Sequence, residues 1–206
     1  DMCLVAEGGN CTILDKRDRG PGFYFYLFSP YVIFHILTKF VIELFKEWWQ
    51  AFLSAGARLI KRNQDAASNV IAVCASTQGE GTVAVDKAGN ALSNAILWMD
   101  MRGAPYLRKQ LNGLINIDGA DVLKILRFVR LTGGMPSMTG KDPAAHMLFI
   151  RDTIPELYAR TYKFLNVLDY INLRLTGEFV ATFDSILTSW VTDNRNPDSI
   201  QYNDSL

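Results

Sequence analysis

Hydrophobic and polar positions divide the chain into an aromatic-rich beginning and a longer part with helix and strand patterns. Residues 21–38 carry no formally charged side chain, and Pro30 interrupts this run. The run is short for a membrane-spanning helix, so buried strands and a membrane span are both open interpretations, with strands favoured. From residue 43 to about residue 61, apolar side chains recur at the spacing of one helix face. This spacing predicts an amphipathic helix that packs on a sheet.

The middle of the chain predicts strands separated by a polar loop. Residues 70–74 form a continuous apolar run, which is typical of a strand covered on both faces in a parallel or mixed sheet. A polar, glycine-bearing stretch follows at 76–81. Residues 82–86 alternate, 86–90 have turn composition, and 95–99 resume a strand pattern. We therefore expect a hairpin-like unit directly after the polar loop.

Beyond Pro105 the pattern is mainly helical. Asp121 to about residue 131 is one predicted helix, and Asp142 as N-cap with Pro143 in the first turn opens another that runs to about Arg151. The remaining predicted elements are a helical turn opened by Pro155, a strand at 163–167, a helix at 169–175 closed by Gly177, and a short strand at 178–182.

Composition and charge narrow the function classes. The 206 residues are 49% hydrophobic and 20% charged, which indicates a folded globule. Lys plus Arg and Asp plus Glu both total 21, so no strong field would attract a nucleic-acid backbone. Three cysteines without a CxxC pair and two histidines far apart disfavour a disulfide framework, a zinc site and a Ser-His-Asp triad. We expect a cytoplasmic protein with no metal site formed by its own histidines and cysteines.

Five short blocks follow one another along the chain at residues 76–81, 95–102, 131–134, 154–160 and 168–178. An upstream helix carries Glu47-Trp48-Trp49. The order of these features resembles that of the FGGY carbohydrate kinases, the family of xylulokinase, ribulokinase and glycerol kinase. Each block alone is a weak pattern, but their common order makes a specific match over residues 43–206.

The resemblance implies an α/β fold of the ribonuclease H-like, actin-like ATPase type, with a mixed sheet flanked by helices. In the family, two such domains bind sugar and nucleotide in the cleft between them. We expect residues 43–206 to form most of the first domain. Residues 1–42 would be an atypical aromatic-rich segment with divergent first strands, and the C-terminal nucleotide-binding domain would be absent.

The resemblance also implies a sugar side of the cleft. The matching loop and strand end carry candidate substrate-binding residues: Gln78, Glu80, Trp98, Asp100 and Arg102. Carboxylates can accept two hydrogen bonds from vicinal hydroxyls, amide and guanidinium groups can donate, and an indole can cover an apolar sugar face. Two alternatives stay open at this point. Asp100 and Arg102 could form only a surface ion pair, and Trp98 could belong to the core.

Other positions depart from the family pattern or carry less information. Gly79 replaces a larger side chain that touches substrate in relatives, so the sugar is not specified. Lys141 is interpreted as a solvated turn lysine, and His146 as a packed histidine rather than a base or ligand. Gly8 and Gly9 are the only part of the sequence that resembles the family's phosphate-binding hairpin, so they are the candidate cofactor-binding residues. The family's catalytic aspartate lies after the matched region, so the catalytic residue is unknown and no metal ligand is assigned.

These observations predict a carbohydrate kinase fragment that supplies the sugar side for transfer of the ATP γ-phosphate to a pentulose or related polyol. ATP and Mg²⁺ are implied by the resemblance, with ATP bound through the second domain, and the fragment alone is expected to be inactive. The alternative is a non-catalytic remnant or interaction module of the same fold, membrane-attached through residues 21–38. We expect the partner to be a sugar or polyol, and neither nucleic acid nor a membrane. The sequence leaves open whether the chain forms a homodimer.

Overall fold

The structure is a computed structural model that describes residues 3–6, 11–12, 44–64 and 68–206. The chain forms two compact units, Asp1–Thr77 and Gln78–Leu206, which are described separately below. The predictions for residues 21–38 and for Gly8 and Gly9 lie outside the described residues. Among the helices that are described, none combines the length and the apolar character needed to cross a membrane.

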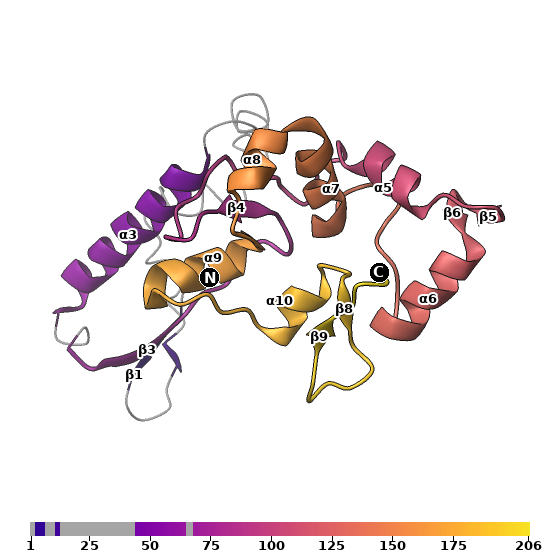
Figure 1. The fold of residues 1–206 in the computed structure, drawn as a ribbon. Helices are drawn as coiled ribbons and strands as arrows, with labels where there is room; N and C mark the ends of the chain where they lie inside the picture. The colour runs from indigo at the N-terminus through magenta and orange to yellow at the C-terminus, as the bar shows by residue number, and fades with distance from the viewer. Residues whose placement is uncertain (1–2, 7–10, 13–43, 65–67) are drawn as a thin grey trace. The chain divides into compact units, whose positions relative to one another are not determined.

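The first unit contains the predicted amphipathic helix and a small sheet (Figure 1). Helix α3 spans Leu44–Arg62 and confirms the helix predicted from the apolar spacing, while its packing on a sheet stays a prediction. Within it, the rings of Trp49 and Phe52 stack with centroids 5.2 Å apart. Strands β1 (Cys3–Ala6), β2 (Cys11–Thr12) and β3 (Val70–Cys74) form an antiparallel sheet in the order β2-β1-β3.

Strand β3 corrects one expectation. The continuous apolar run at 70–74 predicted a strand that is covered on both faces, and the strand is present. However, Ile71 is 62% exposed and Val73 is 47% exposed. In the described sheet β3 is an edge strand that pairs only with β1, and the pairing is antiparallel. An apolar run therefore indicates a strand here, but it does not determine what covers the strand.

The second unit is organised around a short buried ladder. Strand β4 (Val83–Val85) pairs antiparallel with β7 (Lys163–Leu165), and both valines of β4 are completely buried. Isolated bridges join Thr82 to Ile96 and Val85 to Ala91. The predicted turn at 86–90 is confirmed, because Asp86 Oδ1 accepts hydrogen bonds from two backbone N–H groups within this turn. The strand expected at 95–99 is reduced to the bridge at Ile96, after which the chain turns.

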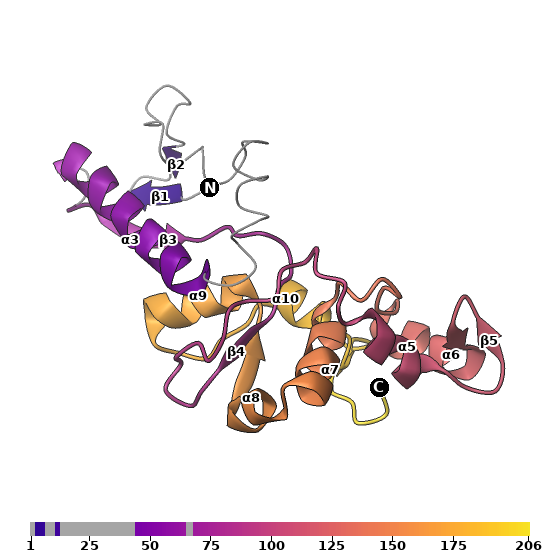
Figure 2. The ribbon, with the colours of Figure 1, turned by 90° about the horizontal axis from the view of Figure 1, so that it is seen from above.

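Helices surround this ladder and continue beyond it (Figures 1 and 2). All three predicted helices and the turn opened by Pro155 are present, with shifts of one or two residues at their ends. The helices are α5 (Ala104–Leu111), α6 (Val122–Thr132), α7 (Pro143–Thr153), α8 (Pro155–Arg160), α9 (Val167–Thr176) and α10 (Phe183–Leu187). Two hairpin-like pairs accompany them: β5 (Asn116–Ile117) with β6 (Ala120–Asp121), and β8 (Thr192–Asp193) with β9 (Gln201–Tyr202).

Capping explains why helix α6 begins and ends where it does. The Asp121 carboxylate accepts hydrogen bonds from the N–H groups of Leu123 and Lys124, which lack partners inside the helix. Gly133 closes α6 with φ 84°, a left-handed conformation that glycine adopts without strain. A second hydrophobic core joins α5, α6 and α7 through Leu107, Leu111, Ala120, Phe128 and Ala145.

Two further expectations differ from the structure. Residues 178–182 were predicted as a strand but form no strand, and Phe179 instead packs edge-on against the Tyr162 ring at 5.5 Å. Every ladder between described strands is antiparallel, so the mixed sheet is not seen in this part of the chain. The second unit is nevertheless built of mixed helices and strands, as the α/β prediction requires.

Candidate functional site

The loop before β4 carries Gln78 and Glu80 in a backbone conformation that its glycines permit. Glu80 has φ 61° and Gly81 has φ 111°, both in the region that favours glycine. A Cβ at Gly81 would lie 3.0 Å from Val167 Cγ2 and 3.4 Å from the Ile96 carbonyl oxygen. A Cβ at Gly79 would meet nothing within 4 Å. The loop is thus tightly packed at Gly81 and open at Gly79, where a larger side chain would find room.

Backbone pairing brings this loop next to the second predicted segment. Thr82 N donates to the Ile96 carbonyl at 2.8 Å, and Ile96 N donates to the Thr82 carbonyl at 2.9 Å. Because the pairing is antiparallel, the residues before Thr82 and the residues after Ile96 leave the same end of the ladder. Residues 78–81 and 98–102 therefore lie side by side.

Asp100 and Arg102 form the ion pair that the sequence left as an alternative. Arg102 Nη2 lies 2.6 Å from Asp100 Oδ2, and both the Nε and the backbone N–H of Arg102 also donate to this carboxylate. Partial burial acts to raise the pKa of Asp100, but the hydrogen bonds and the charge of Arg102 outweigh it and hold the pKa below its ordinary value. The guanidinium lies 4.7 Å from the centroid of the Phe149 ring, so it is fixed from two sides.

His146 connects the turn at Asp100 with Thr82, the residue before strand β4. Its side chain is completely buried; Nδ1 lies 3.0 Å from Thr82 Oγ1, and Nε2 lies 3.1 Å from the Asp100 carbonyl oxygen. A carbonyl only accepts, so Nε2 carries the proton, and in the neutral ring Nδ1 accepts from the Thr82 hydroxyl. Burial lowers the pKa of His146 and favours this neutral form. The packed histidine predicted from the sequence is thus a bridge between the two candidate segments.

Glu80 faces a second carboxylate that the sequence did not assign to the site. Burial, with the charge of Asp142 as the lesser cause, raises the pKa of Glu80 above its ordinary value. Asp142 Oδ2 accepts from Ser137 N at 2.5 Å, and Oδ1 accepts from the Trp190 indole N–H at 3.1 Å. Asp142 is the N-cap residue of α7, as predicted. Its carboxylate binds Ser137 and Trp190 and makes no hydrogen bond that caps the helix.

Trp98 is a surface residue in this arrangement. Its side chain is 44% exposed, and Lys141 Nζ lies 5.7 Å from the ring centroid. Lys141 belongs to the turn that contains Gly140, whose φ of 76° and contact with Ala104 require glycine. The core alternative for Trp98 is therefore wrong. An exposed indole face beside a cation, next to the Asp100–Arg102 pair, is a surface on which a polar ring could stack.

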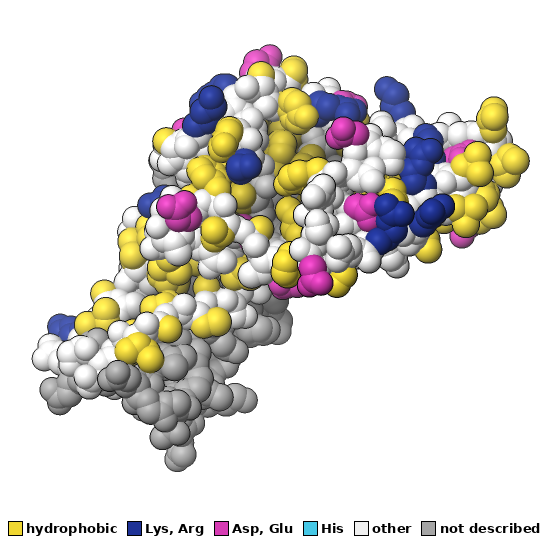
Figure 3. Space-filling model, turned by 60° about the horizontal axis from the view of Figure 1, so that its bottom comes forward, with side chains coloured by type: hydrophobic (Ala, Val, Ile, Leu, Met, Phe, Trp, Pro, Cys, Tyr) yellow, Lys and Arg dark blue, Asp and Glu magenta, His cyan; other side chains and the backbone are white. Residues whose placement is uncertain are grey.

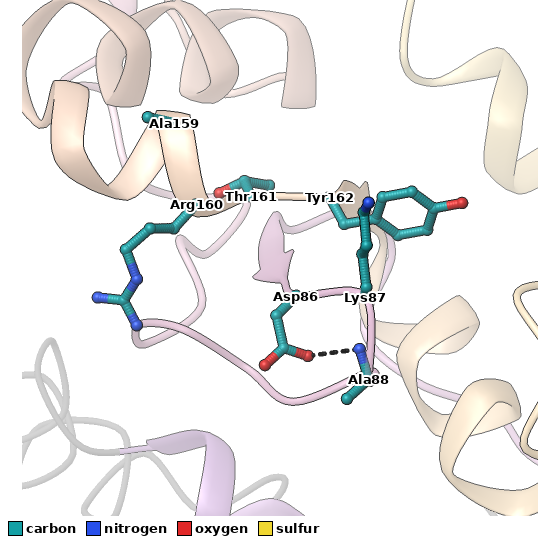
Figure 4. A pocket seen from close by; sticks show the side chains of 7 residues that line it. All are labelled: Asp86, Lys87, Ala88, Ala159, Arg160, Thr161 and Tyr162. Carbon is teal, nitrogen blue, oxygen red and sulfur yellow. Dashed lines mark hydrogen bonds between the residues drawn. The ribbon is translucent and has the colours of Figure 1, made fainter.

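A separate shallow pocket lies at the opposite end of β4 (Figure 4). Its volume is about 500 Å³, and Asp86, Lys87, Arg160 and Tyr162 are among its lining residues. Figure 4 shows the Arg160 and Lys87 side chains flanking Asp86, whose carboxylate holds its own turn. None of the five predicted substrate-side residues lines this pocket.

The nucleotide and metal side of the predicted chemistry is not represented among the described residues. In that part of the chain, no group of three or more His, Cys, Asp or Glu side chains is arranged to hold a metal ion. What the described arrangement can do is present carboxylate, guanidinium and indole groups to a hydroxyl-rich molecule.

Comparisons with known proteins agree with the blocks quoted above. Residues 38–198 match the model of the FGGY family of carbohydrate kinases, N-terminal domain. A xylulose kinase of Bacillus subtilis is 29% identical over 133 residues, which are 64% of this chain and 24% of that protein. A xylulose kinase of Streptomyces coelicolor is 30% identical over 134 residues, 65% of this chain and 25% of that protein. The chain thus matches about a quarter of these relatives' length.

Solved structures resemble the fold. A xyloylose kinase from Brucella ovis superposes with a TM-score of 0.60 at 20% identity, covering 71% of this chain and 28% of that one. A xylulose kinase from Bifidobacterium adolescentis gives a TM-score of 0.53 at 20% identity, covering 71% and 31%. At this identity the likeness concerns the fold alone.

Proposed function

The chain belongs to the FGGY family of carbohydrate kinases, and from this premise we propose that it supplies the sugar-binding side of a kinase for a pentulose or related polyol. The proposed reaction is transfer of the ATP γ-phosphate to one hydroxyl of that sugar. The observation that carries the proposal is the pairing of Thr82 with Ile96, which brings the Glu80 loop and the Asp100 turn together.

The chemistry of the paired segments suits a polyol. A sugar offers adjacent hydroxyls that both donate and accept, and the Glu80 carboxylate can accept from two of them. The Arg102 guanidinium has donors in addition to those held by Asp100, and it is oriented by Phe149. The exposed face of Trp98 can cover the C–H face of the ligand. These groups would hold the sugar without forming a bond to it.

In a kinase, such positioning contributes directly to the rate. Phosphoryl transfer depends mainly on alignment of the acceptor hydroxyl and on charge stabilisation of the transferring group. We propose that residues 78–81 and 98–102 fix the polyol chain so that one hydroxyl points away from them. Bound ATP and Mg²⁺ would supply the phosphoryl group and neutralise its charge, and the chain's own described residues would provide orientation only.

Fold topology, location and nucleotide binding extend this proposal. A ribonuclease H-like topology, as in the actin-like ATPases, is supported by the TM-scores of 0.60 and 0.53 to the two sugar kinases. A cytoplasmic location is consistent with three cysteines and no CxxC pair. We also propose that ATP binds through a second domain, which the family assignment supports.

The proposal is tested by isothermal titration of the full 206-residue chain with D-xylulose, D-ribulose and glycerol. We expect millimolar to submillimolar binding of one ketopentose, weakened at least tenfold by Glu80→Ala, a loss of about 1.4 kcal/mol or more. Gly56→Ala serves as a matched control, since a Cβ there meets nothing within 4 Å. Absence of saturable binding by a folded chain would contradict the proposal.

A second candidate function is polyol binding without phosphoryl transfer. It is favoured by the mutual pairing of Asp100 and Arg102, which occupies part of the charge of both side chains. Because the chain alone is expected to be inactive, the two candidates are separated by joining it to the C-terminal domain of a xylulose kinase and incubating the fusion with ATP, Mg²⁺ and the bound sugar. Sugar phosphate formed above the no-protein control supports the kinase, whereas binding without product supports the binding module.

A further inference from the structure

We propose that the Lys141 ammonium binds the carbonyl oxygen of the sugar and thereby favours a ketose over the corresponding alditol. This inference rests on the proposed function, because it adds one residue to the candidate sugar site. Lys141 lies in the turn before α7, and its Nζ is 5.7 Å from the centroid of the Trp98 ring. The sequence predicted the turn, but the side chain is half-buried rather than fully solvated.

The turn that carries Lys141 is held in place by its neighbours. Gly140 N donates to the Ser137 carbonyl at 3.0 Å. A Cβ at Gly140 would lie 2.1 Å from Ala104 N, so the turn lies directly against the first residue of α5. The buried Asp142 carboxylate accepts from Ser137 N and closes the turn from its other end. Lys141 therefore extends from a fixed stretch of backbone.

The Trp98 side of the pair is positioned by the same helix. Asp100 N donates to the Leu97 carbonyl at 2.9 Å, so Trp98 lies within a tight turn. The Asp100 carbonyl accepts from Nε2 of His146, which lies in the first turn of α7. Lys141 lies two residues before the same helix begins. The separation of the ammonium and the indole is therefore set by α7 and not by two independent loops.

The Lys141 ammonium has no ion pair and no hydrogen bond within the part of the chain that the structure describes. A lysine on a surface normally needs only water, and Figure 3 shows Lys and Arg side chains lying among acidic and hydrophobic ones. Lys141 differs because it is half-buried, and partial removal of an unpaired charge from water is unfavourable. The Asp100 and Asp142 carboxylates already accept from other groups. An acceptor brought by a ligand would therefore be favourable at this point.

The chemistry of an ammonium favours one oxygen of an open-chain sugar. An ammonium has three donors and no acceptor, whereas a hydroxyl both donates and accepts. A carbonyl oxygen only accepts, so it can bind the ammonium without leaving a proton that needs another partner. A hydroxyl in the same place would accept from Lys141, but its own proton would also need an acceptor. A ketose has this carbonyl, and the alditol formed by reducing it has the hydroxyl.

Isothermal titration of the full chain with D-xylulose and with xylitol tests the inference, since xylitol carries a hydroxyl where the ketose has its carbonyl. We expect the wild type to bind D-xylulose about fivefold or more tightly than xylitol. Lys141→Met keeps a side chain of similar length against the indole but removes the donors, so this ratio should fall below about twofold. Lys141→Arg, which is also a cation with donors only, should keep most of the preference.

Lys87→Met is the matched control. Lys87 also lies over an aromatic ring, with Nζ 6.0 Å from the Tyr162 centroid, but at the other end of β4. Its replacement should change neither dissociation constant. The readout is the ratio of the two constants, so a general loss of affinity in Lys141→Met does not count as support. Circular dichroism melts establish that each variant is folded.

Three outcomes would overturn the inference. Equal binding of both sugars by the wild type would do so, as would a preference that survives in Lys141→Met, and either result would leave the proposed function standing. A folded wild type that binds neither sugar would contradict the proposed function and this inference together.

Discussion

The two ends of β4 each carry a turn built on an aspartate, and the two turns differ in what holds them. At one end, Asp86 Oδ1 accepts from the N–H groups of Ala88 and Asn90, so all of these contacts lie within four residues. At the other end, Asp100 binds Arg102 locally, but its carbonyl also accepts from His146, which lies 46 residues away.

The difference indicates which turn can serve as a site. A turn that is stabilised only by its own residues is a local feature and needs nothing from the fold. The Asp100 turn is positioned relative to Thr82, and thus to the Glu80 loop, by one buried imidazole. Precise placement of several side chains is what a binding site requires.

Removal of the His146 imidazole should lower the free energy of unfolding most. His146→Leu leaves the Thr82 hydroxyl and the Asp100 carbonyl buried without their partner, which should cost about 3 kcal/mol of unfolding free energy. Urea denaturation at pH 7 measures it. His146→Gln, which can still donate to the carbonyl, should recover part of the loss. Asp86→Ala at the exposed turn should lower the free energy of unfolding much less. Equal losses in His146→Leu and Asp86→Ala would contradict the proposed difference between the Asp86 and Asp100 turns.

The glycines at the two ends should also differ. Gly81→Ala forces a Cβ at φ 111° close to Val167 and the Ile96 carbonyl, and should destabilise by about 2 kcal/mol or more. Gly89→Ala has φ 79° but meets only the flexible Leu173 side chain, so about 1 kcal/mol is expected. Thermal melts of the two variants give the order. A larger loss of stability in Gly89→Ala than in Gly81→Ala would contradict the tight packing of the Glu80 loop against Val167 and Ile96.

Acid should loosen the Asp100 turn. Its folded-state pKa lies below the unfolded value, so its stabilising contribution is present above the ordinary aspartate range and is lost as pH falls through the folded pKa. Asp100→Asn should therefore cost about 1 kcal/mol or less at pH 7, after allowance for solvent screening, and flatten the decline below pH ~4. Urea titrations at a series of pH values measure both changes. An unchanged slope would show that the ion pair contributes nothing.

Glu80 should show the opposite sign and the smallest effect. Its folded-state pKa is raised, so the folded state binds the proton more tightly and the charged carboxylate is unfavourable at neutral pH. Glu80→Gln should increase stability at pH 7 by less than about 1 kcal/mol, and the gain should vanish as pH falls below the unfolded pKa near 4. The same variant should weaken sugar binding. A variant that is less stable at pH 7 would contradict the raised pKa.

The sequence predicted those features that depend on neighbouring residues. Gly177, which was predicted to close the helix at 169–175, ends α9 through groups within a few positions. The turn at Asp86 has the same local origin. The family blocks also indicate the Gln78 loop and the Trp98–Arg102 segment as candidate site residues.

Features that depend on distant residues were missed or wrong. The predicted strand at 178–182 lacks a partner, and the apolar run of β3 lies at a sheet edge. His146 and Asp142 gave no local signal of their contacts with Thr82, Asp100 and Trp190. Those contacts exist only because α7 packs beside the ladder. Their roles therefore depend on tertiary packing, which residue spacing does not specify.

Amide chemical-shift mapping of the ¹⁵N-labelled chain during titration with D-xylulose would locate the bound sugar. We expect saturable shifts at residues 78–81 and 98–102 and at the Trp98 indole N–H, with residues 86–90 unchanged. Saturable shifts confined to the Asp86 turn, or no saturable shift in a folded chain, would contradict this expectation.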